Sequence, residues 1–256
     1  MVSLIDTFTL NWLIISFFFI IAILYSSVGF GGGSSYLAVL ALSSIAYTQI
    51  RSTALICNIV VVFSNVLLFH KEKLIDWHKT IPLVLFSVPL AFLGGFLKIN
   101  QTIFFILLAS TLLIAAITMW LSKNIITTSK KIKTANCKNA LYGGVIGFIS
   151  GMVGIGGGIF LAPFLHLKNW DIPKKIAATS SVFILVNSIS GLFGQYINPD
   201  FTIDWNLTSI LLITVFLGAQ IGNRMSSKFF SPIQLKKATA ILIAFVSIRI
   251  LIKYLF

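Results

Sequence analysis

A cluster of glycines occurs twice in this chain, each time inside apolar sequence. The copies are Val28-Gly29-Phe30-Gly31-Gly32-Gly33 and Val153-Gly154-Ile155-Gly156-Gly157-Gly158. A glycine in a helix interior costs about 1 kcal/mol relative to alanine, so a run of this density ends a helix. Inside a bilayer the freed N–H and C=O groups find no water, and irregular backbone is stable only within protein or along a wet cavity. The two copies therefore predict two halves of one polar site.

A competing interpretation is that the glycines only allow helices to approach one another closely. Small residues do serve this purpose in membrane proteins, but packing motifs place them four residues apart. The glycines of both clusters are largely consecutive. Their spacing therefore favours the site interpretation.

The composition is that of a polytopic membrane protein. Hydrophobic residues make up 57% of the chain and charged residues 10%, so we predict an all-α fold without a soluble domain. Most apolar runs have about the 20 residues that a spanning helix needs, whereas those flanking the glycine clusters are shorter. Each half is predicted to contain one broken or hairpin helix followed by three transmembrane helices.

The positive charges distinguish a hairpin from a kinked span at each glycine cluster. If the clusters only kink continuous spans, the 19 Lys and Arg residues divide ten to nine between the two faces. If each cluster is the tip of a hairpin, one face carries only Arg51, Lys98, Arg249 and Lys253, and the other carries the remaining 15. Because cytoplasmic loops carry the excess of Lys and Arg, the hairpins are favoured, with the N-terminus outside and the Lys-rich loops in the cytoplasm. The net charge of +13 thus records membrane orientation, and we expect no nucleic-acid partner.

The two halves are predicted to be inverted repeats of one transporter domain that spans residues 1–256. Placing the glycine clusters in register gives repeats at about residues 8–122 and 139–256, joined by a linker at about 123–138. A hairpin plus three spans crosses the membrane an odd number of times, so the second copy is upside down. Matching segments support the register: Thr53-Ala54 with Thr179-Ser180, Asp76-Trp77 with Asp204-Trp205, and Leu93-Gly94-Gly95 with Leu217-Gly218-Ala219.

The inverted arrangement brings the glycine tips together near the midplane, where each tip begins a new helix. The unpaired N–H groups of a helix start carry partial positive charge and bind anions. All six acidic residues lie in connections, which argues against a carboxylate-based cation site, and we expect no metal and no cofactor. The predicted substrate-binding residues combine the tips with polar residues of the following spans: Gly29, Gly31, Gly32, Gly33, Ser34, Ser35, Thr53, Asn58, Gly154, Gly156, Gly157, Gly158, Thr179, Ser180 and Asn187.

The second glycine cluster, the Pro163 that follows it, and the earlier copy resemble the sulfite exporter TauE/SafE family, also called the 4-toluene sulfonate uptake permease family. The resemblance covers essentially the whole chain. It implies a bacterial inner-membrane transporter of sulfur oxyanions or organosulfonates such as sulfite, thiosulfate or sulfoacetate. The first copy departs from the pattern by having Ala38 at the position of Pro163, and Ser34 and Ser35 at the positions of Ile159 and Phe160.

The leading hypothesis is a secondary transporter that moves a small anion by alternating access, driven by a proton or ion gradient. A passive anion channel and a non-transporting membrane subunit are the alternatives. An intramembrane hydrolase using Ser34 or Ser35 as nucleophile lacks a partner base in the sequence. No phosphate-binding loop motif of an ATP-driven pump occurs.

The charge count yields a testable topology. We expect cysteines introduced near Ile99 and Asp200 to react with an impermeant maleimide on intact cells, and cysteines near Lys130 and Lys228 to be protected. The two native cysteines, Cys57 and Cys137, are replaced beforehand so that only the introduced cysteine can react. Labelling near Lys130 without labelling near Asp200 contradicts the predicted orientation.

Overall fold

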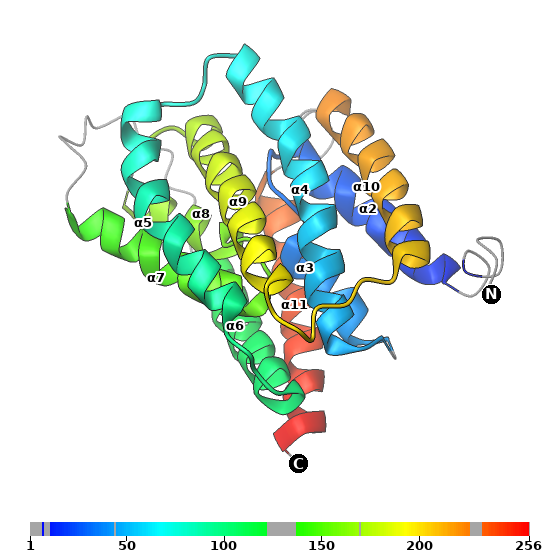
Figure 1. The fold of residues 1–256 in the computed structure, drawn as a ribbon. Coiled ribbons are helices and arrows are strands. Elements are labelled where there is room, and N and C mark those ends of the chain that lie inside the picture. The colour runs from blue at the N-terminus through cyan, green and yellow to red at the C-terminus, as the bar shows by residue number, and fades with distance from the viewer. Residues whose placement is uncertain are drawn as a thin grey trace.

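The computed structural model describes residues 7, 11–43, 45–121, 137–168, 170–225 and 232–255. The secondary structure within these ranges is helical, which confirms the predicted all-α fold (Figure 1). The elements are α2 (Trp12–Ser27), α3 (Gly33–Ala41), α4 (Tyr47–Lys71), α5 (Trp77–Phe96), α6 (Gln101–Leu121), α7 (Cys137–Val153), α8 (Gly158–Leu167), α9 (Pro173–Tyr196), α10 (Trp205–Met225) and α11 (Pro232–Leu255).

Within the described residues, five helices are long and apolar enough to cross a membrane. They are α4, α5, α6, α9 and α10, while α2 and the 140–153 part of α7 are shorter apolar helices. In Figure 1 the 72–76 connection lies at one end of this bundle and the 197–204 connection at the other. The chain is therefore a multi-pass membrane protein, and the predicted linker at 123–138 falls mostly outside the described residues.

Both glycine clusters are the tips of hairpins. The ring of Phe18 in α2 stacks on that of Tyr36 in α3, with 4.5 Å between centroids. In α7 and α8, the rings of Tyr142 and Phe164 lie 4.8 Å apart. A continuous helix rises about 1.5 Å per residue and would hold each pair roughly 27 Å or more apart. The chain therefore reverses at each cluster, as the charge count indicates, and the kinked-span alternative is wrong.

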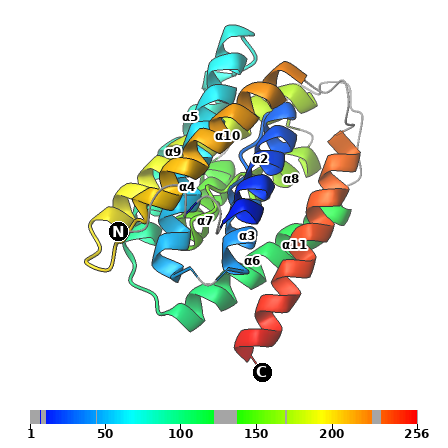
Figure 2. The same cartoon turned by 90° about the vertical axis from the view of Figure 1, so that its right-hand side faces the viewer.

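The same order of helix lengths occurs twice along the chain. The helices α2 to α6 contain 16, 9, 25, 20 and 21 residues, and α7 to α11 contain 17, 10, 24, 21 and 24. Packing between the halves is also reciprocal, because α5 packs on α7 and α10 packs on α2. The last helices of the halves, α6 and α11, lie against each other (Figure 2).

The central helices α4 and α9 run antiparallel. Asn58 in α4 donates a hydrogen bond to Ser188 in α9. Phe69, further along α4, packs with Ala177, which comes earlier in α9. The longest helix of the first half therefore runs opposite to its counterpart in the second half.

A stripe of glycines joins α7 to α5. Gly143, Gly147 and Gly151 lie four residues apart and face the backbone of α5, and a Cβ atom added to Gly151 would lie 2.0 Å from the Ala91 carbonyl oxygen. Gly94 of α5 is equally confined, since its added Cβ would lie 2.2 Å from the Phe148 carbonyl oxygen. These glycines serve close helix packing, as small residues do in membrane proteins.

This packing predicts that Gly94→Ala destabilises the protein. Overpacking costs about 1–3 kcal/mol, which outweighs the gain of about 1 kcal/mol in helix propensity because the neighbour is rigid backbone. Thermal unfolding of the detergent-purified protein measures the loss. The control is Gly191→Ala, whose Cβ would have its nearest neighbour at 3.3 Å. Equal melting temperatures for the two variants would show that the α5–α7 contact is not confining.

Candidate functional site

The two helices that start at the glycine tips have no side-chain cap. The N-cap residues of α3 and α8 are Gly32 and Gly157, and neither start receives a side-chain hydrogen bond at its cap. By contrast, side chains cap α5, α6 and α10: the oxygens of Asp76, Asn100 and Asp204 accept from N–H groups of the first turn. The glycine N-caps, like the N-caps of α4 and α9, therefore leave the first-turn donors to other partners, and in α3 the Gly33 N–H is bonded by Asn58.

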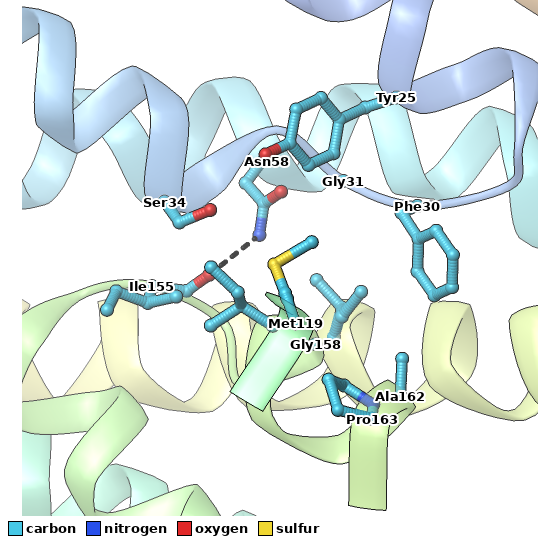
Figure 3. Close-up of a pocket in the computed structure, with 12 residues that line it drawn as sticks. Tyr25, Phe30, Gly31, Ser34, Asn58, Met119, Ile155, Gly158, Ala162 and Pro163 are labelled. Atoms are coloured by element: carbon cyan, nitrogen blue, oxygen red, sulfur yellow. Dashed lines mark hydrogen bonds between the residues drawn. The ribbon is translucent and has the colours of Figure 1, made fainter. Parts of the chain in front are cut away.

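The central pocket of the protein lies between the two tips (Figure 3). In this view residues of the first half, such as Ser34 and Asn58, lie on one side, and residues of the second half, such as Gly158 and Pro163, lie on the other. The lining comprises Tyr25, Phe30, Gly31, Ser34, Asn58, Met119, Ile155, Gly158, Ile159, Ala162, Pro163 and Ile184. None of these side chains carries a formal charge.

Asn58 connects the two tips. Its Oδ1 accepts from the Gly33 N–H at 3.1 Å, and its Nδ2 donates to the Ile155 carbonyl at 3.5 Å, the bond drawn in Figure 3. The same Nδ2 donates to Ser188 Oγ at 3.0 Å. The Asn58 side chain is fully buried. One amide of α4 therefore holds a backbone group of each glycine cluster.

Four of the residues that line the pocket have unpaired backbone N–H groups. The N–H groups of Gly31, Ser34, Gly158 and Ile159 have no hydrogen-bond acceptor within the described part of the chain. Three of them belong to the first turns of α3 and α8, which direct partial positive charge toward the pocket. The N–H of Gly33 is used by Asn58 and is not among the free donors.

The two halves contribute different chemistry at matching positions. In the repeat register, Ser34 corresponds to Ile159 and Asn58 to Ile184, and all four residues line the pocket. The first half supplies a hydroxyl and an amide where the second supplies isoleucines. The lining is therefore mainly apolar, and its serine and asparagine side chains come from the first half alone.

Several predicted site residues lie in hydrogen bonds between helices rather than in the pocket. Thr53 of α4 bonds Thr208 of α10 with 3.0 Å between hydroxyl oxygens. At matching positions, Thr80 of α5 donates to Thr179 of α9 at 3.4 Å. Ser35 is adjacent to the pocket, since its hydroxyl lies 2.7 Å from the Tyr25 hydroxyl.

The remaining predicted glycines shape the tips. Gly29, Gly154, Gly156 and Gly157 have φ between 81° and 86°, a left-handed conformation that glycine adopts without strain. Gly32 is enclosed, because its added Cβ would lie 2.6 Å from Tyr36 Cζ. These residues do not line the pocket themselves.

Two further predicted residues lie in α9 away from the pocket lining. Ser180 is buried, and its hydroxyl has no hydrogen-bond partner among the described residues. Asn187 donates to the Phe183 carbonyl of its own helix, and its Oδ1 is unpartnered within the same ranges.

Sequence reasoning missed the aromatic and aliphatic lining of the pocket. Tyr25, Phe30 and Met119 reach it from α2, the first tip and α6. Phe30 and Ile155 occupy matching positions within the glycine clusters, so the third position of each cluster was the available signal. No local feature marks Met119, which lies almost 90 residues beyond the first tip.

Comparison with known proteins identifies related transporters. The family described as "Sulfite exporter TauE/SafE" matches residues 14–250. A probable membrane transporter protein of Sinorhizobium fredii is 32% identical over 243 residues, covering 91% of this chain and 95% of that protein. A probable membrane transporter protein of Methanocaldococcus jannaschii is 27% identical over 239 residues, covering 85% of this chain and 86% of that protein. No solved structure matched the chain.

The link made by Asn58 predicts a stability difference between two asparagines. Asn58→Ala leaves the Gly33 N–H and the Ile155 carbonyl without partners, and each unsatisfied buried group costs about 1–3 kcal/mol. Asn187→Ala removes a bond within one helix and an unpartnered Oδ1, so the expected loss is smaller. Thermal unfolding in detergent compares the two variants. A melting temperature for Asn58→Ala equal to that of Asn187→Ala would contradict the bridging role.

Proposed function

Because the chain belongs to the sulfite exporter TauE/SafE family, we propose that it is a secondary transporter of small anions. The substrates are sulfur oxyanions or organosulfonates of the sulfite, thiosulfate or sulfoacetate type. The observation that carries this proposal is that the starts of α3 and α8 meet at one pocket, whose lining residues Ser34, Gly158 and Ile159 have unpaired backbone N–H groups. Helix N-termini bind oxyanions through such groups without a buried Lys or Arg.

The chemistry of the pocket supports transport of an anion. Its lining residues supply neutral donors, namely unpaired backbone N–H groups and the Ser34 hydroxyl, which bind an anion without the large desolvation cost of a buried ionic group. The apolar wall formed by Ile155, Ile159 and Ile184 suits the organic part of a sulfonate. This apolar part of the lining supports an organosulfonate among the proposed substrates.

The proposed mechanism is alternating access between two inverted repeats, at about residues 8–122 and 139–256. Antiparallel α4 and α9 and the reciprocal packing of α5 on α7 and α10 on α2 support a pseudo-twofold axis in the membrane plane. In this arrangement each hairpin is packed on a spanning helix of the opposite half. Rocking one half against the other then moves the two tips relative to each other and exposes the pocket between them to each side of the membrane in turn.

We place the protein in the bacterial inner membrane, with its N-terminus outside and its Lys-rich loops in the cytoplasm. A proton or ion gradient drives the transport. The lipid bilayer is its other partner, and the proposal involves no cofactor.

Three alternatives are distinguished by flux and by chemistry. A passive anion channel gives flux that does not saturate with concentration, and a non-transporting subunit gives none. An intramembrane hydrolase needs a general base beside its nucleophile, whereas the pocket lining contributes no His, Lys, Asp or Glu side chain. The pocket therefore supports transport better than hydrolysis.

Substitution of the tip glycines is a poor test of binding. A side chain at Gly32 would meet Tyr36 and Ile21, and a side chain at Gly157 would require a left-handed backbone. Valine at either position is expected to abolish transport by disturbing the hairpin itself. A lining side chain that faces the substrate is the better target.

Ser34→Leu is predicted to reduce saturable uptake at least about tenfold, because it replaces a lining hydroxyl with a bulky apolar group. The assay is uptake into proteoliposomes, screened across sulfite, thiosulfate, sulfoacetate, taurine and sulfate with imposed proton and charge gradients. The control is Ser16→Leu, an exposed position in α2 where serine bonds only its own helix. Wild-type uptake of the transported anion by Ser34→Leu would reject the pocket as the substrate site.

A further inference from the structure

A second pocket lies apart from the glycine tips, near the start of α4 and the end of α9. The connection between α5 and α6 and the connection between α9 and α10 complete its walls. Its polar lining includes Tyr47, Thr48, Arg51, Lys98, Gln195 and Asp200. Unlike the central pocket, it contains formally charged side chains.

Arg51 is buried in this pocket with most of its donors unused. Only 5% of the residue is exposed, although a cationic side chain near a span end is expected to extend to the interface. Its Nε has no hydrogen-bond partner, and its Nη2 makes one contact of 3.5 Å with the Gly151 carbonyl. No carboxylate of the described residues forms an ion pair with it. A buried guanidinium without a counter-charge is costly, so an anionic partner is expected.

Gln195 supplies a second unused donor to the same pocket. The residue is 4% exposed, and its Nε2 has no hydrogen-bond partner within the described ranges. Two side chains from different helices therefore present donors to one cavity. A ligand that satisfies both must be an acceptor.

The Asp200 carboxylate is not the acceptor for Arg51 and Gln195, because it is ion-paired with Lys98. The Lys98 ammonium lies 2.7 Å from the Asp200 carboxylate and joins the two connections that bound the pocket. The Asp200 carboxylate raises the pKa of Lys98, which keeps the ammonium charged. The charges of this pair cancel, and Arg51 contributes the uncompensated positive charge.

We propose that this pocket is a second anion site, which binds a small oxyanion between Arg51 and Gln195. The guanidinium is a planar fork of donors that matches two oxygens of a sulfate-like or phosphate group. The site is distinct from the pocket between the tips and does not depend on the proposed transport function. The same chemistry accommodates a free oxyanion or the phosphate of a lipid headgroup.

The site is physically connected to the second hairpin. Arg51 contacts the carbonyl of Gly151 near the end of α7, and the Arg51 backbone faces Gly154, whose added Cβ would lie 3.3 Å from the Arg51 carbonyl oxygen. An oxyanion that draws the guanidinium toward itself competes with the Gly151 contact. Binding of an oxyanion in this pocket is therefore expected to affect the position of the second tip.

The test is a calorimetric titration of the purified protein with selenate, a tetrahedral dianion. The protein is kept in dodecyl maltoside in a buffer without phosphate. The Ser34→Leu variant serves as the background, since it blocks the central pocket. Selenate is expected to bind this variant. Adding Arg51→Gln to it is expected to weaken selenate binding at least about tenfold, because a charge-assisted hydrogen bond is lost. Gln195→Leu is expected to weaken binding by a smaller factor. The matched control is Arg249→Gln, at an exposed position of α11, which leaves binding unchanged.

Absence of selenate binding in the Ser34→Leu background, or binding that Arg51→Gln leaves unchanged, overturns the second site. Loss of binding on Ser34→Leu with retention in Arg51→Gln alone would instead assign the anion to the central pocket and leave the proposed function intact. Arg51→Lys, which keeps the charge but not the fork, covers the case in which Arg51→Gln does not fold. Competition by short-chain phosphatidylglycerol identifies a lipid headgroup as an occupant, and its failure to compete identifies a free oxyanion.

Discussion

The structure depends on satisfying the backbone groups that two helix breaks expose inside an apolar bundle. Three side chains from the long central helices meet part of this need. Ser181 donates to the Gly29 carbonyl, Asn65 donates to the Phe30 carbonyl, and Asn58 bonds a group of each tip. The donors that these side chains leave unpaired line the central pocket. An unsatisfied backbone group is costly in an apolar environment, so the free donors are the part of each break that a polar ligand is needed to complete.

The reciprocal packing of the halves explains how such tips are held. Each hairpin has its first helix against a spanning helix of the other half, and glycine stripes bring these helix pairs into backbone contact. The tips are anchored in the same way, because Gly29 faces Ala177 of α9 while Gly154 faces Arg51 of α4. A relative movement of the halves is therefore transmitted directly to both tips.

The sequence predicted the helical fold and the two hairpins because both follow from local or summed properties. Glycine density ends a helix wherever it occurs, and the positive-inside bias counts charges without needing their neighbours. The direction in which a side chain points does not follow from such local or summed properties. Thr53 meets Thr208 across 155 residues, a contact that no local pattern encodes. Arg51 lies near a helix start, which favours exposure, but the connections around Lys98 and Asp200 fold over it.

The near-twofold backbone and the asymmetric side chains have separate consequences for the central pocket. The backbone donors of α3 and α8 come from both halves, so the positive potential is shared between the two tips. The side chains are not shared, since the first half contributes Ser34 and Asn58 where the second contributes Ile159 and Ile184. Under the proposed function, an anion is therefore attracted by both halves but is oriented by the polar side chains of one. A ligand with a charged end and an apolar end has a single favourable orientation in such a pocket, whereas a symmetric inorganic anion leaves the apolar wall without a partner.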